Sequence, residues 1–114
     1  MSTYEVARCV HLGSLDRIPP REGKTFDLDG ELVAVFRTAD GGVYATQAEC
    51  PHRGGPLADG FVGAGRVVCP LHAFAFDLES GAPLGHECTG LRTYDVKVDA
   101  DGELTLALGG WEAA

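Results

Sequence analysis

Two short stretches of the sequence place a cysteine and a histidine close together, each with proline directly after the cysteine. The first is CPHRGGPL, with Cys50 and His52, and the second is CPLHAFAF, with Cys69 and His72. Thiolate and imidazole are common ligands of zinc and of iron-sulfur centres. Either pair alone is a weak signal, but both pairs together, in this order, predict one metal site assembled from two loops.

The mixed composition of each pair bears on the kind of metal centre. Zinc accepts two cysteines and two histidines, but the usual zinc-finger spacing pairs cysteine with cysteine and histidine with histidine. Here each stretch supplies one thiolate and one imidazole, so each can give one ligand to each of two metals. A [2Fe-2S] cluster with two cysteines on one iron and two histidines on the other has this requirement. A structural module that binds zinc remains the alternative.

The pattern resembles that of the Rieske family, whose motif is C-x-H, a spacer of similar length, and C-x-x-H. The resemblance implies that Cys50 and Cys69 bind the inner iron of a [2Fe-2S] cluster. It implies that His52 and His72 bind the outer, solvent-facing iron. The fold it implies is an antiparallel β domain with an inserted cluster-binding subdomain, over essentially the whole chain. Further residues that carry the resemblance are Gly54, Gly55, Pro56, Leu57, Gly60, VVCPLH, FDLESG and Pro83, which is similar to the family's proline loop over the cluster.

The surrounding residues are similar to the low-potential, ferredoxin-type members of that family. High-potential, membrane-linked members carry an extra cysteine in each cluster loop, joined as a disulfide, and a serine and a tyrosine that hydrogen-bond to the cluster sulfurs. This chain has Leu71 between Cys69 and His72, and it has Phe74 and Phe76 where those hydroxyls would fall. Hydrogen bonds to sulfur stabilise the reduced cluster, so we expect a potential near the bottom of the Rieske range, about −150 mV.

The function implied by the resemblance is one-electron transfer, with no bond making at this chain. A soluble Rieske protein of this type takes single electrons from a flavoprotein reductase to a terminal oxidoreductase such as an oxygenase. The loops also resemble the small subunit of NAD(P)H-dependent nitrite reductase, a stable enzyme component. The chain is thus expected to be a carrier or a non-catalytic component. A complete oxygenase is not expected, because only His11 and His86 remain for a further iron site.

Length and charge limit the domain count and the partners. A chain of 114 residues fits one domain, 1–114. Its net charge of −8 disfavours nucleic acid and anionic membranes and favours a basic protein partner. The apolar runs are too short for a membrane span, the N-terminus lacks a secretion-signal pattern, and four cysteines suit reduced ligands or thiols. These features predict a cytoplasmic protein.

The elements that must position the site are predicted to be antiparallel strands, because apolar and polar residues alternate at both ends of the chain. Residues 31–38, ELVAVFRT, predict a central strand buried on both faces, which forms a hairpin with 43–47. A second hairpin is predicted around the turn 100–102. Four sets of alternating apolar residues are each predicted to lie on one face of a strand. They are Tyr4, Val6, Val10 and Leu12 in a first strand; Phe26 and Leu28 before a turn at Asp29-Gly30; Tyr94, Val96 and Val98; and Leu104, Leu106 and Leu108.

Residues 48–90 lie between the two hairpins and contain both ligand pairs. This stretch holds eight of the 16 glycines and four of the 6 prolines, with strand signals only at 66–68 and 73–78. Glycine and proline at this density indicate turns and loops. We therefore predict a cluster-binding insertion mounted on a small all-β antiparallel sandwich or open barrel.

Other residues of the same chemical types have structural interpretations. Cys9 and His11 form a third C-x-H, but they lie in an alternating strand and are expected to be a buried thiol beside a satisfied or surface histidine. His86 and Cys88 follow the proline loop and are not expected to be ligands. The alternating Phe74, Phe76 and Leu78 are expected in the core, and Asp59, Asp77 and Glu79 as turn formers or surface charges.

Overall fold

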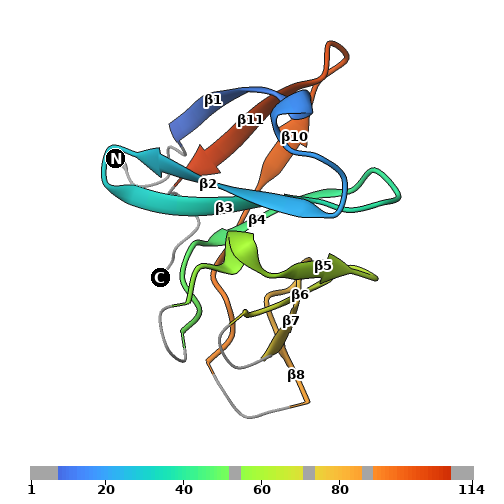
Figure 1. Ribbon diagram of the computed structural model, residues 1–114. Helices are drawn as coiled ribbons and strands as arrows, with labels where there is room; N and C mark the ends of the chain where they lie inside the picture. The colour runs from blue at the N-terminus through green and yellow to red at the C-terminus, as the bar shows by residue number, and fades with distance from the viewer. Residues whose placement is uncertain (1–7, 52–54, 71–73, 86–88, 109–114) are drawn as a thin grey trace.

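A computed structural model describes residues 8–51, 55–70, 74–85 and 89–108. Figure 1 shows three antiparallel sheets arranged one above the other, with strand orders β1-β11-β10, β2-β3-β4-β9 and β5-β6-β7-β8. In the part of the chain described, the helical elements are two short 3₁₀ turns, and no helix could cross a membrane. The elements are β1 (Arg8–Ser14), η2 (Leu15–Arg17), β2 (Glu22–Leu28), β3 (Glu31–Arg37), β4 (Val43–Gln47), η3 (Leu57–Asp59), β5 (Phe61–Gly63), β6 (Arg66–Val68), β7 (Ala75–Asp77), β8 (Pro83–Leu84), β9 (Thr93–Tyr94), β10 (Val96–Val98) and β11 (Glu103–Leu108).

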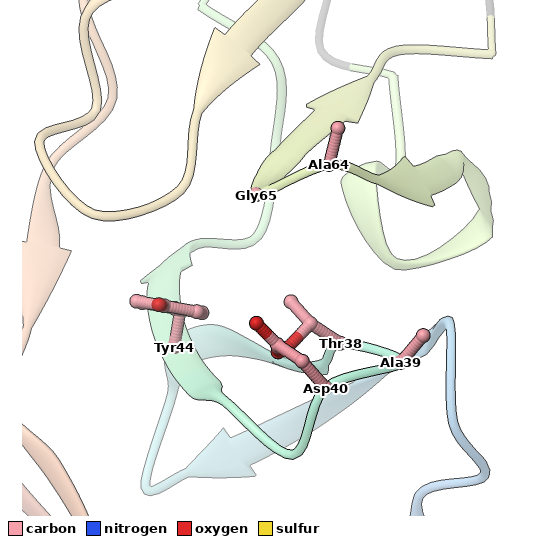
Figure 2. Close-up of a pocket in the computed structure, with 6 residues that line it drawn as sticks. All are labelled: Thr38, Ala39, Asp40, Tyr44, Ala64 and Gly65. Atoms are coloured by element: carbon pink, nitrogen blue, oxygen red, sulfur yellow. The ribbon is translucent and has the colours of Figure 1, made fainter.

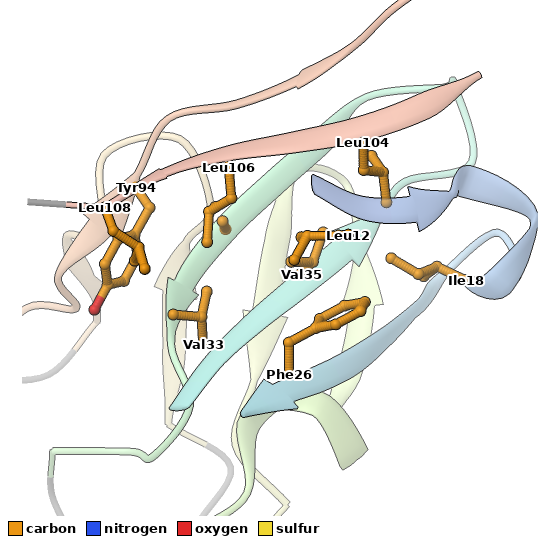
Figure 3. Close-up of a cluster of buried hydrophobic side chains, with 10 residues drawn as sticks. Leu12, Ile18, Phe26, Val33, Val35, Tyr94, Leu104, Leu106 and Leu108 are labelled. Carbon is orange, nitrogen blue, oxygen red and sulfur yellow. The ribbon is translucent and has the colours of Figure 1, made fainter. Parts of the chain in front are cut away.

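The first two sheets enclose one apolar core, whose side chains are drawn in Figure 3. Leu104, Leu106 and Leu108 alternate along β11, so all three point to the same side and are buried there, as predicted. Leu12 of β1 is also buried, whereas the predicted strand residues Tyr4 and Val6 lie outside the described residues. The remaining buried members are Ile18, Phe26, Val33, Val35, Ala45 and Tyr94.

Strand β3 contributes to two cores at once, which confirms the predicted central strand. Val33 and Val35 belong to the core between the first two sheets, while Ala34 and Phe36 belong to a second core that includes the β5-β8 sheet. All four residues are 0% exposed. Because successive side chains of a strand point to opposite faces, an apolar run such as this one requires a cover on both sides.

The predicted hairpins are present. Asp29 and Gly30 have φ of 57° and 95°, so both central residues of the β2-β3 turn are left-handed, which matches the twist of the two strands. Asp27 supports this turn, since its Oδ1 accepts the N–H of Gly30 at 2.8 Å. Strands β3 and β4 pair as expected, and Val98 pairs with Leu104 across the β10-β11 hairpin.

One predicted strand is divided between two sheets. Tyr94 lies in β9, which pairs with β4, whereas Val96 and Val98 lie in β10, which pairs with β11. The chain leaves one sheet and joins the other at Asp95. The sequence predicted that Tyr94, Val96 and Val98 share a face of one strand, but Tyr94 is buried in a different sheet, while Val98 is 39% exposed.

The stretch 48–90 contains a complete four-stranded sheet rather than the two short strands that were predicted. Strands β6 and β7 fall within the expected ranges, while β5 and β8 were missed. Both missed strands are two or three residues long and have no alternating pattern of their own. They become strands because β6 and β7 offer unpaired edges to them.

Candidate metal centre

Two loops begin at the predicted ligand cysteines and are closed in the same way. The N–H of Cys50 donates to the carbonyl of Gly55 at 2.8 Å, and the N–H of Cys69 donates to the carbonyl of Phe74 at 2.7 Å. The closing carbonyl is thus at the same distance along the chain from each cysteine. We call these segments the Cys50 loop (50–55) and the Cys69 loop (69–74).

β pairing positions both loops. The Cys69 loop continues the β6-β7 ladder directly beyond the pair formed by Val68 and Ala75. The Cys50 loop extends from an isolated antiparallel bridge between Glu49 and Pro56. Each cysteine therefore directly follows the last paired residue of its segment, Glu49 or Val68.

Both cysteine side chains are buried in the core of the cluster-binding subdomain. Cys50 is 3% exposed and Cys69 is 1% exposed, and no disulfide joins them. A thiolate in apolar surroundings is costly unless a positive charge compensates it, and a bound iron would supply that charge. The other buried members of this core are Ala34, Phe36, Leu57, Val62, Val67, Phe76, Leu78 and Leu91.

Gly60 allows the Cys69 strand to approach the turn that follows the Cys50 loop. A Cβ at this position would lie 2.1 Å from the carbonyl oxygen of Val68, the residue before Cys69. The φ of Gly60 is −84°, an ordinary value, so the requirement is for space rather than for a left-handed backbone. The sequence marked Gly60 only through a family resemblance, and the contact that explains it is with Val68, across the β5-β6 hairpin.

The segment FDLESG forms the turn between β7 and β8. The Asp77 carboxylate accepts the N–H and the hydroxyl of Ser80 at 2.8 and 2.9 Å, and these hydrogen bonds hold the pKa of Asp77 below its usual value. Asp77 is a turn former, as predicted. The turn leads to Pro83, which pairs with Phe76. Residues 86–88, which follow the predicted proline loop, lie outside the described residues.

The donor set fits a [2Fe-2S] cluster at its sulfur end. Two buried thiols come from two matched loops of one subdomain, as the inner iron requires. When bound, such a cluster gains and loses one electron. His52 and His72 lie within the same two loops but outside the described residues, as do His86 and Cys88. The full ligand set of Cys50, His52, Cys69 and His72 therefore stays a prediction.

The third C-x-H pair, Cys9 and His11, has a structural role, but the predicted burial of its cysteine was wrong. His11 Nε2 lies 2.7 Å from Glu103 Oε1, so this histidine is satisfied, as expected. Cys9 is exposed rather than buried, because it alternates with Val10 and Leu12 and lies on the outer face of β1.

The aromatic residues after the second motif are part of the core, as predicted. Phe76 is 0% and Leu78 is 1% exposed, and Phe74 is partly buried against them. Hydroxyl-bearing side chains at positions 74 and 76 would be needed for the hydrogen bonds to sulfur expected of high-potential members. The chain has phenyl rings at both positions.

A surface cleft lies away from the two thiols. It is lined by residues of the β3-β4 turn and of the β5-β6 turn, which Figure 2 shows facing each other. The β5-β6 turn precedes β6, whereas Cys69 follows it, so the cleft and the thiol are at opposite ends of that strand. The Thr38 hydroxyl and the Gly42 N–H, which donate to Asp40, lower the pKa of that carboxyl. The lining residues are Thr38, Ala39, Asp40, Tyr44, Ala64 and Gly65.

Two sequence relatives are similar to this chain over most of its length. The chain is 31% identical over 110 residues to the anthranilate 1,2-dioxygenase ferredoxin subunit of Burkholderia cepacia, covering 96% of this chain and 100% of that protein. It is 40% identical over 91 residues to the 4beta-methylsterol monooxygenase of Methylococcus capsulatus, covering 71% of this chain but only 25% of that protein.

Solved structures give the same picture. A protein described as the small subunit of an NADH-dependent nitrite reductase from Mycobacterium tuberculosis has a TM-score of 0.82 and 27% identity, covering 96% of this chain and 98% of that one. The ferredoxin of carbazole 1,9a-dioxygenase from Nocardioides aromaticivorans has a TM-score of 0.78 and 37% identity, covering 88% and 97%. The ferredoxin-type, all-β fold predicted from the sequence is confirmed.

The family model for the Rieske [2Fe-2S] domain matches residues 7–95. This range includes both cysteine loops, all three sheets in part or whole, and both predicted histidines. The expected [2Fe-2S] cofactor and the role in electron transfer agree with it. With matched thiol loops, an antiparallel fold and this family match together, the chain belongs to the Rieske [2Fe-2S] domain family.

Proposed function

We propose that this chain is a low-potential Rieske carrier that takes single electrons from a flavoprotein reductase to a terminal oxygenase. Cys50 and Cys69 would hold the inner iron, and His52 and His72 would hold the outer iron. The observation on which the proposal chiefly rests is the pair of buried thiols at the start of two identically closed loops.

The described residues also support a low potential. The core around the thiols consists of apolar side chains, and Phe76 is fully buried in it. A phenyl ring excludes water but donates no hydrogen bond to sulfur, so nothing in that ring favours the extra negative charge of the reduced state. We therefore expect a potential near the lower limit of Rieske centres, about −150 mV.

The partner proposal combines charge with the identities of the relatives. Two of them are ferredoxins of dioxygenase systems, and a solved complex with a TM-score of 0.79 contains the oxygenase and ferredoxin of carbazole 1,9a-dioxygenase. With a net charge of −8, this chain would be attracted to basic surfaces and repelled by nucleic acid and anionic membranes. We place it in the cytoplasm, where its thiols would remain reduced.

The second candidate is the small subunit of an NAD(P)H-dependent nitrite reductase. It is favoured by the likeness to such a subunit over 96% of this chain and 98% of that one. Under this alternative the chain would be a permanent component of a larger enzyme and would not exchange between partners. A second solved nitrite reductase small subunit is 36% identical to this chain and the carbazole dioxygenase ferredoxin is 37% identical, so identity does not rank the two roles. We place the carrier first because several sequence relatives are ferredoxin components of dioxygenase systems.

The first experiment is metal analysis and EPR of the purified protein. We expect two irons and two acid-labile sulfides per chain, a red-brown colour, and the anisotropic Rieske signal after reduction with dithionite. A colourless protein with one zinc would overturn the proposal in favour of a structural zinc module. Co-purification then separates the two redox roles: a stable stoichiometric complex with a sirohaem protein would establish the nitrite reductase subunit instead of an exchanging carrier.

A further inference from the structure

An apolar row crosses the outer face of the β5-β8 sheet. The strand registers place Phe61 opposite Val68, Val68 opposite Ala75, and Ala75 opposite Leu84. Laterally paired residues of a sheet point to the same face, so these four side chains form one continuous line across all four strands. We call this set the apolar row.

The apolar row faces away from the core. Val62, Val67 and Phe76 alternate with its members along the strands and are buried on the inner face. Phe61 is 81% exposed, and the other three members are partly exposed. Contiguous apolar patches on a surface often mark binding sites, and aromatic side chains are over-represented where partners bind.

The apolar row lies next to the Cys69 loop. Val68 directly precedes Cys69, and Ala75 directly follows Phe74, whose carbonyl closes that loop. Two residues farther from the loop, the same face carries Arg66 opposite Asp77. The outer face is thus apolar at the end near the proposed cluster and charged at the other end.

Charge indicates which kind of protein this row would bind. The segment 48–90 contains five carboxylates and two arginines, so a second copy of this chain would meet like charge. Four side chains also provide much less area than the roughly 800 Å² per partner of a stable interface. A small apolar patch on a segment of net negative charge suits a partner that binds briefly, through an apolar patch flanked by lysine and arginine.

We propose that the apolar row, with Phe61 as its main contact, is the docking surface for the redox partner of this chain, a basic oxidoreductase. This inference rests on the proposed carrier function. A partner bound there would contact Val68 and Ala75, which adjoin Cys69 and Phe74, and Phe61 would enter its apolar patch. Exposed aromatic residues that become buried in this way often dominate the binding energy.

The test measures electron transfer to oxidised cytochrome c, a basic haem protein, by stopped flow from the dithionite-reduced holoprotein. Three variants are compared with the parent protein. Phe61→Ser removes the ring, Phe61→Leu keeps an apolar side chain, and Val98→Ser removes an exposed apolar residue from the β10-β11 hairpin, outside the β5-β8 sheet. EPR spectrum and potential are recorded for every variant, and sedimentation velocity is measured for the parent and for Phe61→Ser.

We expect Phe61→Ser to lower the second-order rate constant at low salt about tenfold, a change typical of a binding hot spot. Phe61→Leu and Val98→Ser should stay within about twofold of the parent, a change that corresponds to little binding energy. The EPR spectrum and potential should not change. Equal rates for Phe61→Ser and Val98→Ser would overturn the docking surface and leave the carrier function intact. A dimer of the parent that Phe61→Ser dissociates would also overturn it, in favour of self-association. The absence of a Rieske signal in the parent would instead refute the proposed function itself.

Discussion

Gln47 and Arg92 join the two points at which the chain enters and leaves the cluster-binding subdomain. Gln47 Oε1 accepts the backbone N–H of Arg92 at 2.8 Å, and the backbone N–H of Gln47 donates to the carbonyl of Arg92 at 2.9 Å. Gln47 Nε2 also donates to the carbonyl of Glu49, one residue before Cys50. The side chain of Gln47, at the end of β4, is therefore bonded to two other segments. One is the chain at Arg92, where it leaves the cluster-binding subdomain, and the other is Glu49, just before the Cys50 loop.

Replacing Gln47 should loosen this junction. We expect Gln47→Ala to lower the free energy of unfolding by about 1 to 2 kcal/mol, because two hydrogen bonds of the side chain are lost. Amide exchange at Arg92 should accelerate. Gln47→Glu is the matched control, since it keeps the acceptor for Arg92 but removes the donor to Glu49, and its Arg92 amide should stay protected. Equal exchange at Arg92 in all three proteins would contradict this account.

The cysteine ligands can be separated from the exposed thiol by substitution. We expect Cys50→Ser and Cys69→Ser to lose most of their iron and acid-labile sulfide, because each removes one of the two thiolates of the inner iron. Cys9→Ser is the control, as Cys9 lies on the outer face of β1. It should retain full iron content and the EPR spectrum of the parent. Loss of cluster from Cys9→Ser, or its retention in either loop variant, would show that the ligand assignment is wrong.

The histidine ligands should set the range of the potential. His72→Cys should retain some cluster, with a lower potential, because a thiolate adds negative charge where a neutral imidazole was bound. Redox titration followed by EPR measures the shift. His52, the other predicted ligand of the outer iron, would keep one imidazole there, and the mixed ligand set should change the form of the spectrum as well. A potential identical to that of the parent would refute this explanation of the tuning.

The close approach at Gly60 can be tested without touching a ligand. Gly60→Ala places a Cβ where the carbonyl oxygen of Val68 lies, and overpacking of this kind typically costs about 1 to 3 kcal/mol. We expect a lower melting temperature and a faster loss of cluster, followed by the visible absorbance. Gly63→Ala in the adjacent β5 is the control, because a Cβ there meets nothing within 4 Å. If both variants melt alike, the contact has no energetic importance.

Tyr94 makes the folding stability of this protein depend on pH in the alkaline range. Its hydroxyl donates to Glu31 Oε2 at 2.9 Å, and burial together with this carboxylate raises the pKa of Tyr94 above its usual value of 10.0. The folded state therefore favours the protonated phenol. The resulting stability is fully present below pH 10.0 and is lost as the pH rises through the folded pKa.

Tyr94→Phe should accordingly lower the free energy of unfolding by about 1 kcal/mol at pH 8, the typical value of one hydrogen bond. Above pH 10 the parent protein loses the contribution of Tyr94, so the difference between parent and variant should shrink. Urea unfolding followed by circular dichroism at several pH values measures this difference. A gap that is constant or that widens above pH 10 would contradict the sign worked out here.

The sequence by itself determined the chemistry of the metal centre and the positions of strands β3 and β11. Thiolate and imidazole at fixed short spacing select a small set of metal centres, whatever the surrounding fold. The apolar run at 31–38 predicted a strand covered on both faces, and alternation at Leu104 and Leu106 predicted a one-sided strand, because these periods are local properties of the chain.

Only the tertiary structure decided which distant segments meet. The division of the chain at Asp95 depends on β4, far along the sequence. The strands β5 and β8, the need for glycine at position 60 and the exposure of Phe61 beside Val68 depend on pairing with the neighbouring strand. A two-residue strand has no period to detect, and a glycine that makes room for a carbonyl looks like any other glycine. Pairing and close packing arise from non-local contacts, which local patterns do not encode.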